Sequence, residues 1–266
     1  MIIYLEKSLK NNPKALNIIA KYPWAQVLEI DNYKNIFDKT LAWTTKKSII
    51  IAKVNNALTK IPDNYGHTQD WYFFKNSLNC VYDCEYCYLK WAFKNDIEVF
   101  FVNYDDIKSQ IKNVVENSNS NIEKWFYSSD YSDNLATDNI TDFCEEFIPF
   151  FDTLENAKME IRTKSVNISK LLKMQPAKNT EIAFSLNPES IISKYEHKTP
   201  SLDLRIKAIN ALLNAGWLVW VRFIPLLEVP DYEKIYREFV EYVVKNIDFT
   251  KINSVFIGWL LYTKDD

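Results

Sequence analysis

Three cysteines lie within eight residues, with the spacing C-x3-C-x2-C: Cys80, Cys84 and Cys87. The chain has one other cysteine, Cys144, so chance clustering explains this group poorly. A structural zinc site usually has four ligands in paired C-x2-C arms, and neither His67 nor His197 lies close in sequence. Iron–sulfur clusters bind cysteine thiolates, and three thiolates on a 4Fe–4S cubane leave one iron open. The spacing therefore favours such a cluster over a zinc site or three ordinary buried cysteines.

An open iron atom indicates cofactor chemistry. S-adenosylmethionine can chelate that iron through its amino and carboxylate groups. One electron from the cluster then cleaves the sulfonium and releases a 5′-deoxyadenosyl radical, which the protein positions and shields. The C-x3-C-x2-C loop resembles the signature of the radical S-adenosylmethionine superfamily. We therefore expect a 4Fe–4S cluster and S-adenosylmethionine as cofactors, and a flavodoxin- or ferredoxin-type electron donor as a partner.

The composition of the 266-residue chain excludes several other classes of protein. It has three glycines, Gly66, Gly216 and Gly258, about a sixth of the average share. Phosphate-binding loops need several glycines close together, so Walker, Rossmann and kinase-type loops are excluded. A net charge of −3 gives no overall basic field for nucleic acid. Basic charge is mostly lysine, and the arginines are Arg162, Arg205, Arg222 and Arg237.

The same sequence gives no sign of a membrane or secretory segment. It contains no run of about eighteen apolar residues, so we expect no membrane span. The N-terminus lacks the pattern of a signal peptide. We therefore expect a cytoplasmic location, where clustered cysteines are more often metal ligands than disulfides.

The elements that must position the cysteines follow an alternation of strands and helices. In the first sixty residues, strands are predicted over 2–5, 25–30 and 48–54, and a helix over 13–21. The segment 60–68 is rich in turn residues and forms a plausible boundary. We therefore expect a small N-terminal α/β subdomain over residues 1–62.

Six strand-length apolar runs follow this boundary, at 71–74, 125–128, 158–163, 181–185, 217–223 and 254–259. Helical periodicity separates them, most clearly over 140–151, 201–214 and 231–246. A further apolar run, 97–102, does not fit this order. Alternation of this kind is typical of a parallel sheet or barrel. The fold class predicted is α/β, with a partial (β/α)6 TIM-like barrel over residues 63–266.

Several motifs resemble the spore photoproduct lyase family. The segment Cys84-Glu85-Tyr86-Cys87-Tyr88-Leu89 is similar to the C-x-Y-C-Y-L loop of those enzymes. The stretches IYLEK, EIDNY and YEHKTPSL, the last followed by Arg205, resemble the same family, from residue 2 to about 260. This resemblance implies a six-unit partial barrel. It also implies a radical that splits a thymine photodimer in DNA.

The resemblance assigns roles to individual residues. It implies that the three clustered cysteines ligate the 4Fe–4S cluster. It places Lys164 near the cofactor carboxylate, with a solvated surface lysine as the alternative. It makes Ser185 a polar cofactor-binding residue, with a helix cap as the alternative. Both follow predicted strands, at the end where barrel enzymes keep their sites. Tyr86 and Tyr88 match tyrosines proposed to relay a hydrogen atom, and Tyr86 is also expected beside the cofactor. Aromatic packing around the cluster is their alternative.

One departure from the family concerns hydrogen transfer. The lyases have a cysteine just after the second barrel strand as hydrogen donor to the product radical, and Asp130 occupies that place here. A thiol S–H gives up a hydrogen atom readily, whereas a carboxylic O–H does not. Tyr131 is the alternative donor. Cys144 lies on the apolar face of a predicted helix and is expected to be a small buried residue.

Another departure concerns the cofactor-binding turn. The superfamily usually has a Gly-Gly-Glu turn after the second strand, but residues 127–130 are Tyr-Ser-Ser-Asp. We therefore expect Ser128, Ser129 and Asp130 to supply the polar contacts there. The chain stops at Asp266, whereas the lyases continue, so most of the DNA-contacting surface of the family is expected to be missing.

These observations predict a radical S-adenosylmethionine enzyme that acts on a nucleic-acid base, with DNA or another nucleic acid as a partner. An alternative is hydrogen abstraction from a peptide or small molecule. Another alternative, from a different functional class, is a non-catalytic iron–sulfur or zinc-binding module that pairs with a partner chain. Tryptophans that could stack bases are expected mostly in the core: Trp71, Trp91, Trp125, Trp217, Trp220 and Trp259.

Overall fold

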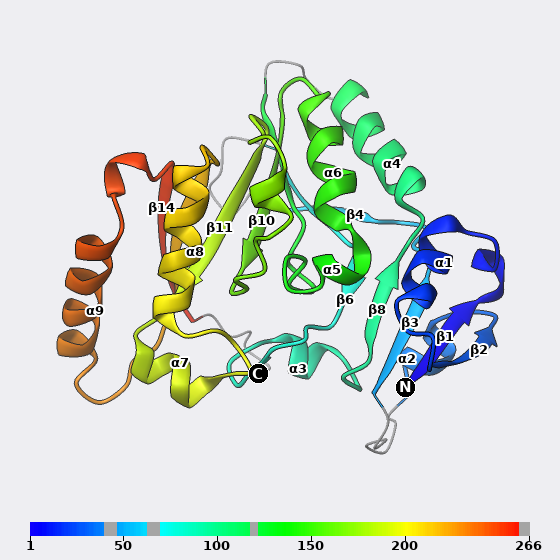
Figure 1. The fold of residues 1–266 in the computed structure, drawn as a ribbon, viewed down its shortest axis with the longest axis horizontal. Helices are drawn as coiled ribbons and strands as arrows, with labels where there is room; N and C mark the ends of the chain where they lie inside the picture. The colour runs from blue at the N-terminus through cyan, green and yellow to red at the C-terminus, as the bar shows by residue number, and fades with distance from the viewer. Residues whose placement is uncertain (40–46, 63–69, 118–121, 261–266) are drawn as a thin grey trace.

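The computed structural model describes residues 1–39, 47–62, 70–117 and 122–260 (Figure 1). Within these residues the chain forms a five-stranded sheet, a seven-stranded sheet and a two-stranded ribbon. His67 lies outside the described residues. No helix in the described part of the chain is long and apolar enough to cross a membrane.

The five-stranded sheet has the order β2-β1-β3-β8-β6. Its parallel strands are β1 (Ile2–Glu6), β2 (Gln26–Ile30), β3 (Ser48–Ala52) and β8 (Glu98–Phe101), and β6 (Ser77–Leu78) is antiparallel. With α1 (Pro13–Ala20), these confirm the elements predicted in the first sixty residues. The unplaced run 97–102 forms β8. Its residues are buried on both faces, as in interior parallel strands.

The seven-stranded sheet has the order β14-β13-β11-β10-β9-β5-β4. Six strands are parallel and follow chain order: β5 (Asp70–Phe74), β9 (Lys124–Tyr127), β10 (Ala157–Thr163), β11 (Thr180–Leu186), β13 (Val219–Leu226) and β14 (Ser254–Trp259). The antiparallel strand β4 (Leu58–Lys60) pairs with β5. This half-barrel confirms the predicted fold class. Strands β6 and β8, which follow residue 62, belong to the five-stranded sheet, and β4, which precedes it, belongs to the seven-stranded sheet. The division into domains of residues 1–62 and 63–266 remains a prediction.

Helices cover one face of the half-barrel (Figure 1). The longer ones are α4 (Tyr104–Asn117), α6 (Phe143–Asp152), α8 (Leu202–Asn214) and α9 (Tyr232–Asn246). The connection from β10 to β11 has only a 3-10 helix (Leu171–Lys173). The core is aromatic where α6 meets the sheet, because Phe147 packs on Phe74 and Phe151 on Phe126, each at 5.5 Å between ring centroids.

The remaining short elements lie around the ends of the strands. They are α2 (Lys34–Phe37), α3 (Leu89–Ala92), α5 (Asp138–Thr141), α7 (Glu189–Tyr195), and the two-stranded ribbon of β7 (Asp83–Cys84) and β12 (Glu196–His197), with 3-10 turns at Lys7–Leu9 and Phe249–Lys251. Gly216 ends α8 with a φ of +88°, where a side chain would be strained.

The single helix predicted over 140–151 is wrong, because Asp142 divides it into α5 and α6. Asp142 has a left-handed φ of 54°, which Asp tolerates better than most residues. Its carboxylate accepts a hydrogen bond from Asn17 at 2.7 Å and forms ion pairs with Lys21 and Lys170. These contacts from α1 and from the segment after β10 fix a turn that apolar periodicity does not reveal.

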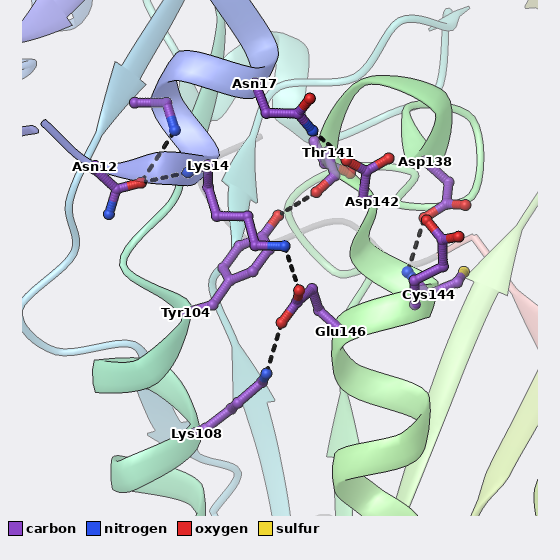
Figure 2. A network of polar contacts seen from close by, with 12 residues as sticks. Asn12, Lys14, Asn17, Tyr104, Lys108, Asp138, Thr141, Asp142, Cys144 and Glu146 are labelled. Atoms are coloured by element: carbon purple, nitrogen blue, oxygen red, sulfur yellow. Dashed lines mark hydrogen bonds and ion pairs between the residues drawn. The ribbon is translucent and has the colours of Figure 1, made fainter. Parts of the chain in front are cut away.

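The same region attaches α1 to the half-barrel (Figure 2). Glu146 on α6 forms ion pairs with Lys14 of α1 and with Lys108 of α4, the latter at 2.8 Å. The Tyr104 hydroxyl donates to the Thr141 carbonyl at 3.1 Å. The N-terminal helix is therefore held to α5 and α6 through partly buried charges.

We predict that Asp142→Ala lowers the free energy of unfolding by about 2 kcal/mol, because Lys21, Lys170 and Asn17 lose their acceptor. Urea unfolding measures the loss. Asp31→Ala, which removes an exposed pair with Lys7, should cost less than about 0.5 kcal/mol. Equal losses for both variants would contradict the structural role of Asp142.

The cost of Asp142→Ala should also depend on pH. Burial alone would raise the pKa of Asp142, but its bonds and charges with Lys170 and Lys21 outweigh it and hold that pKa below 3.8. A depressed pKa stabilises the fold above the ordinary value and loses that effect below it. The difference between wild type and variant should therefore be full near pH 6 and shrink below about pH 4.

Candidate active site

The three clustered cysteines line one cavity of about 440 Å³ at the carboxyl ends of the barrel strands. The loop that carries them is fixed by backbone bonds. β7 pairs with β12, which sets Cys84 opposite Glu196. The Cys87 amide donates to the Cys84 carbonyl at 3.1 Å, and the Glu85 amide donates to the Tyr195 carbonyl at 2.8 Å. The sequence therefore folds this loop against a segment more than a hundred residues away.

A buried ion pair lies directly behind this loop. Arg205 and Glu196 have fully buried side chains, and their nitrogen and oxygen atoms are 2.5 Å apart. Glu196 also accepts from the Tyr86 hydroxyl and, at 2.8 Å, from Asn187. Burial alone would raise the pKa of Glu196, but the charges of Lys164 and Arg205 outweigh it and hold that pKa below its usual value. The carboxylate is therefore charged and fully bonded.

The same arginine reaches the end of β11. It donates to the Ser185 carbonyl at 2.9 Å, the Thr199 hydroxyl at 2.7 Å and the Pro200 carbonyl at 3.0 Å. Arg205 thus joins the cysteine loop, the β11 end and the β12–α8 connection. The cavity wall depends on this one guanidinium.

The thiols have the environment of ligands for a cationic group. Burial raises the pKa of Cys84 to about 11, although Lys164 lowers it. Burial also raises the pKa of Cys80. Thiolates in such a place need a positively charged partner, and three of them on one cavity fit an iron–sulfur cluster. In the described ranges, no three His, Cys, Asp or Glu side chains are grouped so as to hold a single metal ion.

The loop after β9 supplies the opposite wall. Ser129 and Ser132 line the cavity, and their buried hydroxyl oxygens have no hydrogen-bond partner within the described part of the chain. Asp133 accepts from the Lys164 amide at 2.8 Å and from the Thr163 hydroxyl at 2.7 Å. Buried hydroxyls without a partner are uncommon in folded proteins, and these two belong to residues that line the cavity.

A pair of amides holds this loop in place. Asn76 and Asn134 exchange two side-chain hydrogen bonds of 2.9 Å, and Asn134 also donates to the Ser128 carbonyl at 2.7 Å. Both are buried. Because Asn76 lies four residues before Cys80, the pair fixes the β9 loop relative to the cysteine loop.

Lys164 and Ser185 both line the cavity. Lys164 is partly buried, and its ammonium lies 5.5 Å from the centre of the Tyr86 ring. Ser185 is buried within β11, and Pro188 is the residue that precedes α7, so the helix-cap alternative is wrong. Their cofactor-binding roles stay predictions.

The predicted tyrosines take different positions. The Tyr86 hydroxyl donates a hydrogen bond to Glu196, and Tyr86 lines the cavity. Tyr88 donates to the Asp130 carbonyl at 2.8 Å and to its carboxylate at 3.0 Å. Asp130 in turn pairs with Arg162 at 3.1 Å. Tyr88, Asp130 and Arg162 therefore form one bonded group on the cavity wall.

Two predicted residues lie elsewhere. Ser128 donates its hydroxyl to the Glu160 carbonyl at 3.0 Å and does not line the cavity. Tyr131 also does not line it: its ring packs against Phe73, 6.4 Å between centroids, and under the Lys75 ammonium. The structure thus groups Ser129 and Asp130 with the cysteines but not Ser128 or Tyr131.

Sequence reasoning missed Ser132, Asp133 and Arg162 as cavity residues. The sequence could have indicated them. Ser132 and Asp133 follow β9, and Arg162 lies near the end of β10, at the same edge of the sheet as the other site residues. Arg222 lies deeper in the half-barrel, where it pairs with the buried Glu160.

Of the other residues considered from the sequence, Trp259 lines the cavity, whereas Cys144, His197 and Trp91 do not. Cys144 is completely buried, as expected. His197 contacts Glu85 at 2.7 Å. Of the six tryptophans expected mostly in the core, Trp125 and Trp217 are buried, whereas Trp91 and Trp259 are 76% and 56% exposed. The short α3 and the outer strand β14 leave them uncovered, and Trp259 lines the cavity.

A half-barrel with three cysteines in the loop after its first strand defines the class of radical S-adenosylmethionine proteins. The family model of spore photoproduct lyase matches residues 25–260. The chain belongs to the spore photoproduct lyase family.

Individual relatives agree with this assignment. The chain is 31% identical over 163 residues to the spore photoproduct lyase of Clostridium acetobutylicum, covering 61% of this chain and 48% of that protein. It is 26% identical to that of Bacillus subtilis over 163 residues, or 61% and 47% of the two chains. The match thus spans about half the length of these relatives.

The fold is also that of solved family members. A mutant spore photoproduct lyase with bound AdoMet and dinucleoside spore photoproduct superposes with a TM-score of 0.87 at 19% identity, over 99% of this chain and 79% of that chain. A second structure, complexed with dinucleoside spore photoproduct, gives 0.85 at 18% identity over the same shares.

We predict that Arg205→Met destabilises the protein by about 3–5 kcal/mol, because it leaves the Glu196 carboxylate buried without its partner. The free energy of unfolding in urea checks this. Arg237→Met changes an exposed arginine on α9 and should stay within about 0.5 kcal/mol. If Arg205→Met is too unstable to measure, Glu196→Gln, which keeps an acceptor, should show a smaller loss. Losses no larger than that of Arg237→Met would count against the buried pair.

Proposed function

We propose that this chain is a radical S-adenosylmethionine enzyme that acts on a nucleic-acid base, as the spore photoproduct lyases do. The observation that carries the proposal is the convergence of Cys80, Cys84 and Cys87 on one cavity with Lys164 and two unpartnered serine hydroxyls. Family membership and the solved relative with bound AdoMet support it. The substrate proposed is a thymine photoproduct of DNA or a related base.

The chain's own residues bind and orient the cofactors. A 4Fe–4S cluster on the three cysteines, together with S-adenosylmethionine, supplies a 5′-deoxyadenosyl radical. Lys164 offers its ammonium to the cofactor carboxylate, and Ser129 and Ser132 offer hydroxyls to its polar groups. Glu196 keeps the Tyr86 ring against the cavity, which excludes water from one side.

Hydrogen return to the product is where this chain departs from its family. The Tyr88 hydroxyl donates to the Asp130 carboxylate at 3.0 Å, so Tyr88 offers a phenol at the place of the missing thiol. Hydrogen abstraction from a peptide or small molecule is the second candidate function, favoured by the absence of that thiol. A flavodoxin- or ferredoxin-type donor would supply the electron. We propose a cytoplasmic location, where clustered cysteines are more often metal ligands than disulfides.

Anaerobic reconstitution should give about four iron atoms per chain, and dithionite with S-adenosylmethionine should release 5′-deoxyadenosine. Cys84→Ala should abolish both. Lys164→Ala should weaken S-adenosylmethionine binding about tenfold to a hundredfold, measured by equilibrium dialysis, while Lys207→Ala on the exposed face of α8 should not. A colourless protein with one bound zinc would refute the cluster, and a clustered protein that releases no deoxyadenosine would refute the enzyme.

Asp130→Cys should increase cleavage of the dinucleoside spore photoproduct, because it restores a thiol beside Tyr88. Thymidine released per deoxyadenosine formed is the measurement. Asp130→Ser, which also breaks the bonds to Tyr88 and Arg162, should show no such gain. Equal yields from wild type and Asp130→Cys would mean that the missing thiol does not limit the reaction.

A further inference from the structure

A row of aromatic rings begins beside the cofactor cavity and leads to β9. The Tyr88 hydroxyl on the cavity wall donates to the Asp130 carbonyl at 2.8 Å, and that carbonyl belongs to the peptide bond that leads to Tyr131. The Tyr131 ring lies 6.4 Å from the Phe73 ring, which lies 6.1 Å from the Tyr127 ring, between centroids. One hydrogen bond and one peptide unit therefore connect the cavity to the first ring of the row.

The row ends at Trp125, which is buried on the same strand as Tyr127. These two rings are stacked, with centroids 6.4 Å apart and planes at 25°. The Trp125 indole N–H donates to the Glu123 carboxylate at 2.7 Å, and the Glu123 side chain is partly exposed. The Lys158 ammonium lies 5.3 Å from the centre of the Trp125 ring. The far end of the row is therefore an indole bonded to a carboxylate that reaches solvent.

Trp125 differs in this respect from the neighbouring tryptophans. The Trp220 ring lies 5.1 Å from the Trp125 ring. Among the described residues, however, the buried indole nitrogens of Trp217 and Trp220 have no hydrogen-bond partner. Aromatic packing explains contacts between rings, but it does not place a partly exposed carboxylate on one indole nitrogen. The row therefore has a chemically distinct end at Trp125.

Both ends of the row have the groups that a one-electron oxidation needs. A phenol or an indole loses a proton when it loses an electron, and the acceptor must lie within hydrogen-bond reach. The Tyr88 hydroxyl donates to the Asp130 carboxylate at 3.0 Å, and the Trp125 indole donates to Glu123. The Lys158 ammonium repels the positive charge of an oxidised indole and so favours release of its proton.

We propose that Trp125 is a relay residue that returns an electron to Tyr88 after Tyr88 has given its hydrogen atom to a carbon radical in the cavity. The inference rests on the proposed function, which supplies the radical. Trp125 does not line the cavity and acts only through Tyr88, so it is not a catalytic residue. The relay gives the chain a way to restore its phenol with an electron from outside the cavity.

The step balances in electrons and protons. The carbon radical takes the Tyr88 hydrogen atom, so a C–H bond forms, the phenolic O–H bond breaks and a phenoxyl radical remains. An electron from Trp125 and a proton from water, passed through Asp130, restore the phenol, while the oxidised indole gives its proton to Glu123. The low-potential electron donor of the proposed function then reduces the indolyl radical, which takes its proton back. Each carbon radical quenched in this way uses one electron and one proton.

The test is pulse radiolysis of the full chain without cofactors. The azide radical oxidises tryptophan by one electron, and indolyl and phenoxyl radicals absorb at different wavelengths. A relay between Trp125 and Tyr88 also runs in reverse, so wild type should convert indolyl to phenoxyl radical at a rate independent of protein concentration. Trp125→Phe and Tyr88→Phe should each lose this phase. Trp217→Phe, which changes a buried tryptophan outside the row, should keep it.

Glu123→Gln tests the relay without removing a ring. It keeps an acceptor for the indole N–H but cannot hold the proton, so the phase should slow by at least about tenfold. A phase that survives Trp125→Phe or Tyr88→Phe, or that Glu123→Gln leaves unchanged, would overturn the inference. Loss of the phase in Trp71→Phe but not in Trp125→Phe would also overturn it, because the Trp71 ring lies 5.7 Å from the Tyr127 ring.

Deoxyadenosine release by the reconstituted protein tests the proposed function separately. A chain that shows the relay phase but releases no deoxyadenosine would refute the function alone. A chain that releases deoxyadenosine but lacks the phase would refute the inference alone.

Discussion

The cavity depends on the ion pair of Arg205 and Glu196, which is fully buried. Removing two such charges from water is costly, and their attraction repays it only when the remaining donors and acceptors are also bonded. Here they are: the guanidinium reaches three further oxygens, and the carboxylate accepts from Tyr86 and Asn187. Because those partners come from the cysteine loop, the β11 end and the β12–α8 connection, one pair sets the relative position of all three.

Asp130, at the position where the resemblance to the family predicts a cysteine, is part of a local arrangement. Its carboxylate bonds to both Tyr88 and Arg162, so the loop after β9 is tied to the cysteine loop and to β10. A thiol would form neither contact with comparable strength. The chain therefore has a charged link between these loops.

The barrel strands could be predicted because parallel strands, covered on both faces, appear as continuous apolar runs. The ribbon of β7 and β12 could not, since two residues carry no periodicity and Cys84 pairs with Glu196, more than a hundred residues further along the chain. The helix break at Asp142 depends on lysines from two other segments. Likewise, the cysteine spacing predicts the cluster ligands. Which serine lines the cavity, Ser132 and not Ser128, depends on where β9 ends and the following loop turns. Local pattern thus gives the elements, and distant contacts give the orientation of the polar side chains.

Of the thirty-two basic residues, four are arginines. Three of these, at positions 162, 205 and 222, form ion pairs within the half-barrel with Asp130, Glu196 and Glu160. Of these three, Arg205 uses its planar group to bond several acceptors at once, as its fixed fork of donors allows. Three of the four arginines therefore form ion pairs within the half-barrel, and the fourth, Arg237, is exposed on α9.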